Sequence, residues 1–164
     1  MTVKEFVEKF INSTDKVKTC EKHVIKDKYI SYQEKIGTCI SIVKNTNYAK
    51  VGEDMVYNRN TPAQYVQFAM TMINLYTDID IDFSNILDCF NALDKYDAID
   101  ALMGAIPQNE FTKFRTLLDM VQDDEYENNR NMTSYIDNFL QPFKAIMNNE
   151  ALMNKIQEML PTEE

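Results

Sequence analysis

Residues 61–76 read TPAQYVQFAMTMINLY, a segment in which apolar side chains lie almost all the way round a helix. Thr61 and Gln64 match the capping-box pattern, and Pro62 lies in the first turn, where its missing N–H costs nothing. A helix this apolar belongs in the middle of a core or beneath a partner. The segment therefore predicts a central helix around which the other elements pack.

The sequence on both sides of this segment predicts further helices. Capping boxes at Thr2 and Ser31 open apolar stripes that end near Ser13 and near residues 45–47. After the central helix, residues at helical spacing predict more helices beginning near Ser84, Asp97 and Pro107, and again from residue 132. With only three glycines and four prolines, the chain has few tight turns. We expect a mainly α fold, a compact bundle of six to eight helices forming a single domain over residues 1–164.

Three segments depart from this pattern. Residues 48–57 place two short strand candidates around a turn at Gly52 and predict a small β-hairpin or an ordered loop. Residues 16–30 show no clean period and are expected to be extended, with at most one strand. Pro142 interrupts the stripe that begins at Met132, so we expect a kink or a break there. A last short helix is predicted over residues 152–160.

The charge distribution restricts the partners. The chain carries a formal charge of −9, with +3 on residues 1–60 and −12 on residues 61–164. An acidic surface repels phosphate backbones, so we expect no direct binding of nucleic acid and favour a protein partner with basic groups. No window approaches the length of a membrane span, and no secretory signal is seen, so we expect no membrane association. Cys20, Cys39 and Cys89 are then free thiols in a reducing compartment.

Candidate sites for chemistry are weak. Asp78, Asp80 and Asp82 alternate as in a calcium loop, but the required glycine and closing glutamate are absent, which favours an extended segment with Ile79 and Ile81 inward. The only histidine, His23, could join the three cysteines around zinc, but a second closely spaced ligand pair is missing. His23 also has no glycine-rich elbow or carboxylate signature beside it. We expect no catalytic residue, no metal site and no cofactor, and hence a non-enzymatic role, with a carboxylate-based enzyme as a less favoured alternative.

Two segments are candidate partner-binding surfaces. One is the densest acidic cluster in the chain, which is either a solvated helix face or a docking surface for a basic partner. The other is the apolar stripe from Met132, which is either intramolecular core or a helix that packs against another copy. The candidate residues are Asp119, Asp123, Asp124, Glu125 and Glu127 in the first segment, and Met132, Tyr135, Phe139, Phe143 and Met147 in the second.

Four stretches of the chain resemble a group of proteins. They are MTVKEFVEKF at residues 1–10, LYTDID at 75–80, AIP at 105–107 and LLDMVQDDE at 117–125. This pattern is similar to that of small acidic proteins, mostly uncharacterised, encoded by tailed bacteriophages and prophages of Gram-positive bacteria. The resemblance implies a protein made in the bacterial host cytoplasm during particle assembly, and it brings no catalytic residues with it.

The leading hypothesis is a virion structural accessory or a head or tail assembly factor, such as a tail assembly chaperone. Its partners would be other phage structural proteins or a second copy of the chain. The alternative is an acidic, nucleic-acid-mimicking inhibitor of a host defence nuclease, an anti-CRISPR-like role in which acidic side chains occupy a basic channel.

Overall fold

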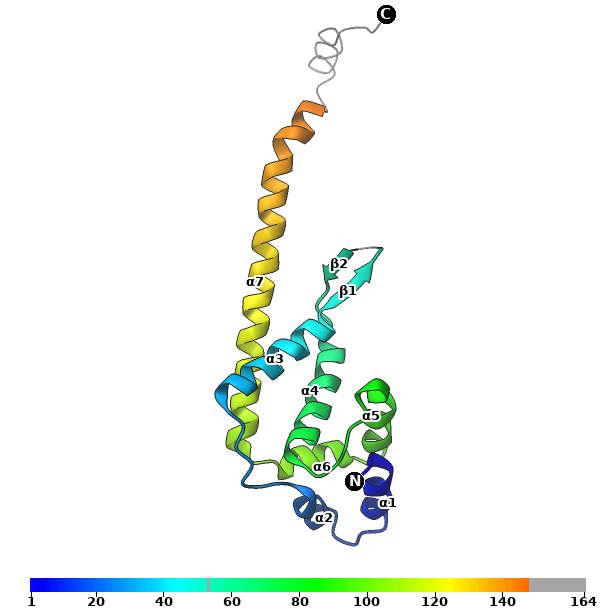
Figure 1. The fold of residues 1–164 in the computed structure, drawn as a ribbon. Helices are drawn as coiled ribbons and strands as arrows, with labels where there is room; N and C mark the ends of the chain where they lie inside the picture. Colours follow the sequence, from blue (N-terminus) through cyan, green and yellow to red (C-terminus); the bar gives the residue numbers. More distant parts are fainter. Residues whose placement is uncertain (53, 148–164) are drawn as a thin grey trace, which may run out of the picture. The chain divides into compact units, whose positions relative to one another are not determined.

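The computed structural model confirms the mainly α fold. It describes the backbone of residues 1–52 and 54–147 and the side chains of residues 1–52 and 55–130. Within these residues the chain forms seven α-helices, one 3₁₀ turn and one two-stranded hairpin (Figure 1). The elements are α1 Val3–Ile11, α2 Lys16–His23, α3 Tyr32–Thr46, β1 Tyr48–Val51, β2 Asp54–Tyr57, α4 Thr61–Tyr76, η1 Phe83–Asn85, α5 Ile86–Asp94, α6 Ala98–Ala105 and α7 Gln108–Met147.

The chain divides into two compact parts, Met1–Gln122 and Asp123–Glu164. The first part holds α1 to α6, the hairpin and the first turns of α7. The second part holds the rest of α7 as far as Met147. All of the packing described below lies within Met1–Gln122.

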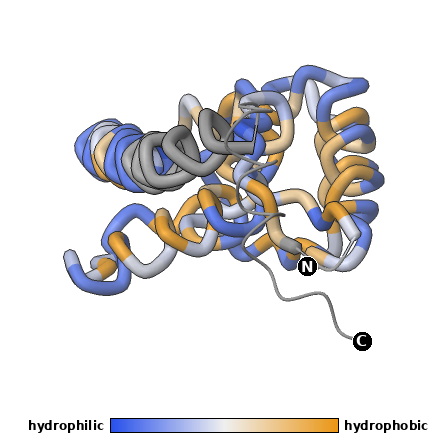
Figure 2. The backbone as a smooth tube through the Cα atoms, turned by 90° about the horizontal axis from the view of Figure 1, so that it is seen from above, coloured by the Kyte–Doolittle hydropathy of each residue, from blue (hydrophilic) through white to orange (hydrophobic). Residues whose placement is uncertain are grey.

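Helix α4 is the central helix of this part, as the sequence predicts. It lies between α3 and α5 (Figure 1), and Phe68, Met72, Ile73 and Tyr76 are among its buried residues. Its N-cap is Asn60, one residue before the predicted Thr61, because the Asn60 side chain accepts a hydrogen bond from the Ala63 N–H. Figure 2 shows how apolar and polar segments succeed one another along the helical tubes.

Two apolar clusters pack on α4. The first core gathers residues of α1, α2, α4, α5 and α6, including the fully buried Phe6, Leu93 and Leu102. The second core gathers residues of α3, α4 and α7, including Cys39 and Phe114. Since α4 contributes to both clusters, it needs apolar side chains around most of its circumference, which is the pattern that residues 61–76 display.

The predicted hairpin is confirmed. Strands β1 and β2 pair antiparallel, with Tyr48 opposite Tyr57 and their rings 5.6 Å apart in an edge-on arrangement. Gly52 in the turn has a φ of 66°, a conformation that glycine adopts without steric cost. The fully buried Asn47 closes the base of the hairpin, because its carbonyl accepts from Asn58 N at 2.7 Å.

The extended structure predicted for residues 16–30 is wrong in its first half. Lys16–His23 forms α2, and the carboxylate of its N-cap Asp15 accepts from the Lys18 N–H at 3.0 Å. Only Cys20 of this helix is buried, so its sequence carries no apolar stripe. Extended backbone resumes at Val24, which forms an isolated bridge with Thr77.

The helix ends predicted beyond residue 96 need two further corrections. Asp97 precedes α6 but has a φ of 57° and makes no side-chain capping bond. Helix α7 continues through Pro142 to Met147, so of the kink or break expected at this proline the break is absent, and the two separate helices expected after Pro107 are one. The helix predicted at residues 152–160 lies outside the described residues. No helix among the described residues combines the length and apolar character that crossing a bilayer needs.

Candidate functional site

A groove of about 750 Å³ runs between α1 and α5. We call it the α1–α5 groove. Val3, Val7 and Ile11 form one ridge along α1 at intervals of four residues, and Cys89 and Ala92 lie on the α5 side. The complete lining is Thr2, Val3, Lys4, Val7, Glu8, Ile11, Asp80, Asp82, Asp88, Cys89, Ala92, Lys95 and Tyr96.

The ridge of α1 both packs on the first core, through Val3 and Val7, and lines the groove. Phe6 and Phe10 are fully buried in the first core, with their rings 5.7 Å apart. Val7 follows Phe6 and Ile11 follows Phe10 in the sequence, so each valine or isoleucine side chain points about 100° away from the preceding phenylalanine around the helix. Ile11 is 44% exposed. The apolar stripe of α1 is thus wider than the core requires, a signal that the sequence contains but that does not by itself locate the opposite wall.

Charged groups surround the apolar floor of the groove. All six charged residues of the lining are exposed. Four are carboxylates and two are lysines: Glu8, Asp80, Asp82, Asp88, Lys4 and Lys95. Hydrogen bonds from Ser84 and then Asn85 lower the pKa of Asp82 and keep it charged. A rim with a net charge of −2 around an apolar floor is suited to an apolar segment flanked by basic residues.

The strand-like segment 77–82 confirms the predicted alternation. Ile79 and Ile81 are buried, whereas the three aspartates between and beside them are exposed. The segment is held by backbone bonds, with Asp78 N donating to His23 O at 3.0 Å and Asp80 N donating to Met1 O at 2.7 Å. Among the described residues, no group of three His, Cys, Asp or Glu side chains could hold a metal ion.

His23 has a carboxylate partner that the sequence did not reveal. Its Nδ1 lies 3.0 Å and 3.1 Å from the two carboxylate oxygens of Asp78, 55 residues away, and its ring meets Phe6 edge-on. In the described residues, no hydroxyl or thiol is hydrogen-bonded to the other ring nitrogen. Cys20, one turn before His23, is fully buried, and burial raises its thiol pKa to about 11. Asp78 and Phe6 thus hold the imidazole in one orientation.

A second charged cluster lies inside the second core. Glu110 Oε2 lies 2.5 Å from Lys35 Nζ and accepts from the Tyr76 hydroxyl at 2.7 Å, while Oε1 accepts from Lys113 Nζ at 3.0 Å. Burial alone would raise the pKa of Glu110, but the bonds from Lys35, Tyr76 and Lys113 outweigh it and lower the pKa to about 2. Burial, then the bond to Glu110, raises the pKa of Tyr76. Through the Glu110 carboxylate this cluster links α3, α4 and the first turn of α7.

The acidic residues predicted as a partner surface all lie on α7. Asp119, Asp123 and Asp124 are exposed, Glu125 is half-buried, and Glu127 Oε1 lies 3.8 Å from Arg130 Nη1. Met132, Tyr135, Phe139, Phe143 and Met147 belong to the helical backbone of α7, but their side chains lie outside the described part of the chain. The α1–α5 groove involves none of these ten residues.

Comparisons of the chain with protein-family models, with curated proteins and with solved structures found no match.

Proposed function

We propose that this is a non-enzymatic interaction protein that binds an amphipathic helix of a partner protein in the α1–α5 groove. The observation that carries the proposal is a groove of about 750 Å³ with an apolar floor and a rim whose net charge is −2. Helices commonly bind to other proteins by laying an apolar face into such a groove. The rim selects a helix whose flanks carry lysine or arginine.

The biological setting that we propose is the assembly of a phage particle. In that setting the chain is a virion accessory or a head or tail assembly factor, and its partner is another particle protein. The resemblance of residues 1–10, 75–80, 105–107 and 117–125 to small acidic phage proteins supports this setting, as does the acidic composition. Purified particles and assembly intermediates, analysed by mass spectrometry, should contain the protein. Its absence from both contradicts the assembly role.

The groove chemistry can be tested with two model peptides. They share one leucine face, and one carries lysine and the other glutamate at the flanking positions. We expect the lysine peptide to bind the full chain, with affinity falling as salt rises, and the glutamate peptide to bind at least tenfold more weakly. Ile11→Asp should abolish binding, because it places a charge on the apolar floor.

Val17→Asp is the matched control. Val17 is 63% exposed on α2 and does not line the groove, so this variant introduces the same charge elsewhere. Equal loss of binding in both variants, or equal binding of the two peptides, contradicts the proposal. If a basic nuclease instead binds the chain through α7, with Ile11→Asp having no effect, the nuclease-inhibitor alternative replaces it.

A further inference from the structure

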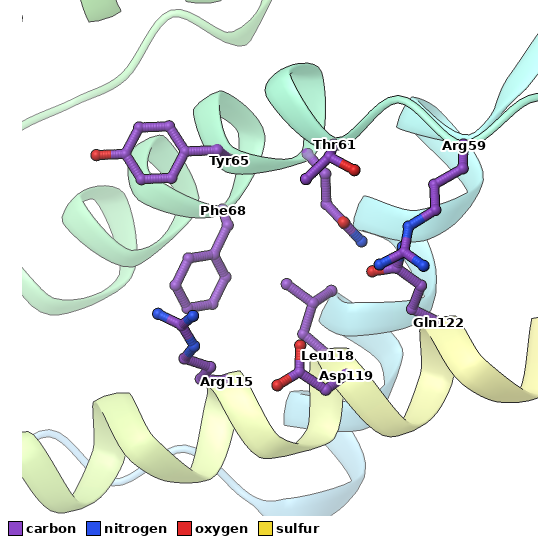
Figure 3. A pocket seen from close by; sticks show the side chains of 9 residues that line it. Arg59, Thr61, Tyr65, Phe68, Arg115, Leu118, Asp119 and Gln122 are labelled. Atoms are coloured by element: carbon purple, nitrogen blue, oxygen red, sulfur yellow. The ribbon is translucent and has the colours of Figure 1, made fainter.

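A separate cleft of about 280 Å³ lies between the start of α4 and α7 (Figure 3). Unlike the α1–α5 groove, it is lined by arginines. We call it the arginine cleft. Arg59 approaches from the segment before α4, and Arg115 approaches from α7. These are two of the three arginines in a chain of net charge −9. The other lining residues are Thr61, Gln64, Tyr65, Phe68, Leu118, Asp119 and Gln122.

Two buried amides fix one of the arginines. Gln64 and Gln122 are 5% and 3% exposed. With its amide turned so that the oxygen faces Arg59, Gln122 accepts from Arg59 Nη2 at 2.9 Å and donates to Gln64 Oε1 at 2.8 Å. The Arg59 guanidinium has five N–H donors, so others remain for a ligand. A cation held in place before binding loses little conformational entropy when a ligand arrives.

The second arginine, Arg115, is exposed on α7. Arg115 makes no hydrogen bond or ion pair in the part of the chain that the structure describes, and Figure 3 shows its guanidinium beside the Phe68 ring. Asp119 is the one carboxylate in the lining, so the cleft carries two cations against one anion. A planar guanidinium matches the geometry of a carboxylate or a phosphate through paired hydrogen bonds.

The walls and size limit the rest of the ligand. Phe68 and Leu118 are each 7% exposed and supply an apolar wall, to which Tyr65 adds a half-exposed ring. The volume of about 280 Å³ is just below the range of ~300–1,000 Å³ typical of pockets for drug-sized ligands. A nucleic-acid strand or a dinucleotide is too large for it.

We propose that the arginine cleft binds a small organic oxyanion, a carboxylate or phosphate monoester carried on a compact apolar or aromatic body. The oxyanion pairs with the Arg115 guanidinium, and the body packs on the neighbouring Phe68 and Leu118 (Figure 3). This site is independent of the proposed protein partner, because it shares no lining residue with the α1–α5 groove.

The test titrates the isotope-labelled full chain with four probes and follows its amide resonances. Phenyl phosphate and 3-phenylpropionate carry both the anion and the ring, inorganic phosphate lacks the ring, and benzyl alcohol lacks the anion. We expect shifts at residues 59–68 and 115–122 with the first two probes, and binding at least tenfold weaker for the other two. Whichever of the first two binds more tightly identifies the oxyanion.

Arg115→Ala should weaken binding by on the order of tenfold or more, because it removes a charge-assisted paired contact. Arg130→Ala is the matched control, since Arg130 is the third arginine and lies outside the cleft. Arg115→Lys keeps the charge without the planar guanidinium, so its affinity for phenyl phosphate should lie between those of Arg115→Ala and Arg130→Ala. Benzyl alcohol binding as tightly as phenyl phosphate, equal loss in Arg115→Ala and Arg130→Ala, or no shift with any probe overturns the proposal.

Discussion

Each of the two cores of Met1–Gln122 has an acid–base pair that joins distant segments of the chain, and these two pairs differ in burial more than in distance. In the second core, Lys35 Nζ and Glu110 Oε2 are 2.5 Å apart, and the side chains are 4% and 10% exposed. At the edge of the first core, His23 Nδ1 and Asp78 Oδ1 are 3.0 Å apart, but the carboxylate is 54% exposed.

The difference shows that separation alone does not measure what a pair contributes. When an exposed group loses its partner, water solvates its charge instead, so breaking the pair lowers the free energy of unfolding only slightly. A buried partner has no such alternative, so the loss of one group leaves an uncompensated charge inside the protein. The second core should therefore be sensitive to polar substitutions and to acid, whereas the first core should respond mainly to changes in apolar volume.

The largest expected effect follows from Glu110→Ala. It leaves the buried Lys35 ammonium without its carboxylate, and we expect the free energy of unfolding at pH 7 to fall by about 3–5 kcal/mol. Urea unfolding of the full chain measures it. Lys113→Ala is the control, because Lys113 contacts the same carboxylate but is 58% exposed, and it should change stability by less than about 1 kcal/mol. A similar, small change in both variants would show that the burial argument is wrong.

Acid should weaken the second core selectively. The pKa of Glu110 is about 2 in the folded protein, below its ordinary 4.5, so its stabilising contribution is complete above pH 4.5 and is lost between pH 4.5 and about 2. The loss is on the order of 3 kcal/mol, at about 1.4 kcal/mol per pKa unit. Unfolding free energies measured across this window test it.

Two variants separate this effect from general acid sensitivity. Glu110→Gln should flatten the decline, because the side chain no longer titrates. Leu102→Ala, a cavity in the first core, should lower stability by about 2–5 kcal/mol at every pH without changing the slope. An unchanged slope in Glu110→Gln would assign the acid sensitivity to other carboxylates.

A smaller effect is expected from Tyr76→Phe. The variant removes one of three donors to Glu110 but keeps the ring, which packs edge-on against Phe114. A hydrogen bond to a charged group contributes about 1.5–3 kcal/mol, and we expect the lower end because Lys35 and Lys113 remain. Tyr65→Phe, at a side chain that is 53% exposed, should change the unfolding free energy by less than about 0.5 kcal/mol.

The smallest effect is expected from Asp78→Asn. The amide oxygen can still accept from His23, and the exposed carboxylate loses only a solvent-screened charge, so stability should change by about 0–1 kcal/mol. Thermal unfolding at pH 6 and pH 8 provides the measurement. A loss comparable to that of Glu110→Ala would remove the distinction between the two cores.

The sequence predicted the elements whose burial pattern is periodic. Residues 61–76 are apolar around most of the helix because two cores pack on them, and the hairpin is marked by a glycine at its turn. Helix α2 was missed because only Cys20 among its eight residues is buried, so the sequence shows no apolar stripe there. The N-cap hydrogen bond of Asp15 is the local feature that marks its start. The continuous α7 was missed because the segment between residues 122 and 131 is polar and shows no apolar period.

The candidate sites were predictable only in part. The wide apolar stripe of α1 is visible in the sequence, whereas the protein-binding role favoured by the charge and the lack of catalytic motifs stays a prediction. Arg59 and Arg115, however, are 56 positions apart, and Lys35 and Glu110 are 75 positions apart. Chain folding alone brings each pair together, and no local spacing in the sequence signals it.

The placement of the three thiols has a practical consequence for experiments. Cys20 and Cys39 are fully buried, and burial raises the pKa of each to about 11, so alkylating reagents should modify them slowly in the folded protein. Cys89 is half-buried in the wall of the α1–α5 groove. The rate at which iodoacetamide labels this residue should therefore report whether the groove is occupied, in cell extract as well as with purified protein, without any engineered probe.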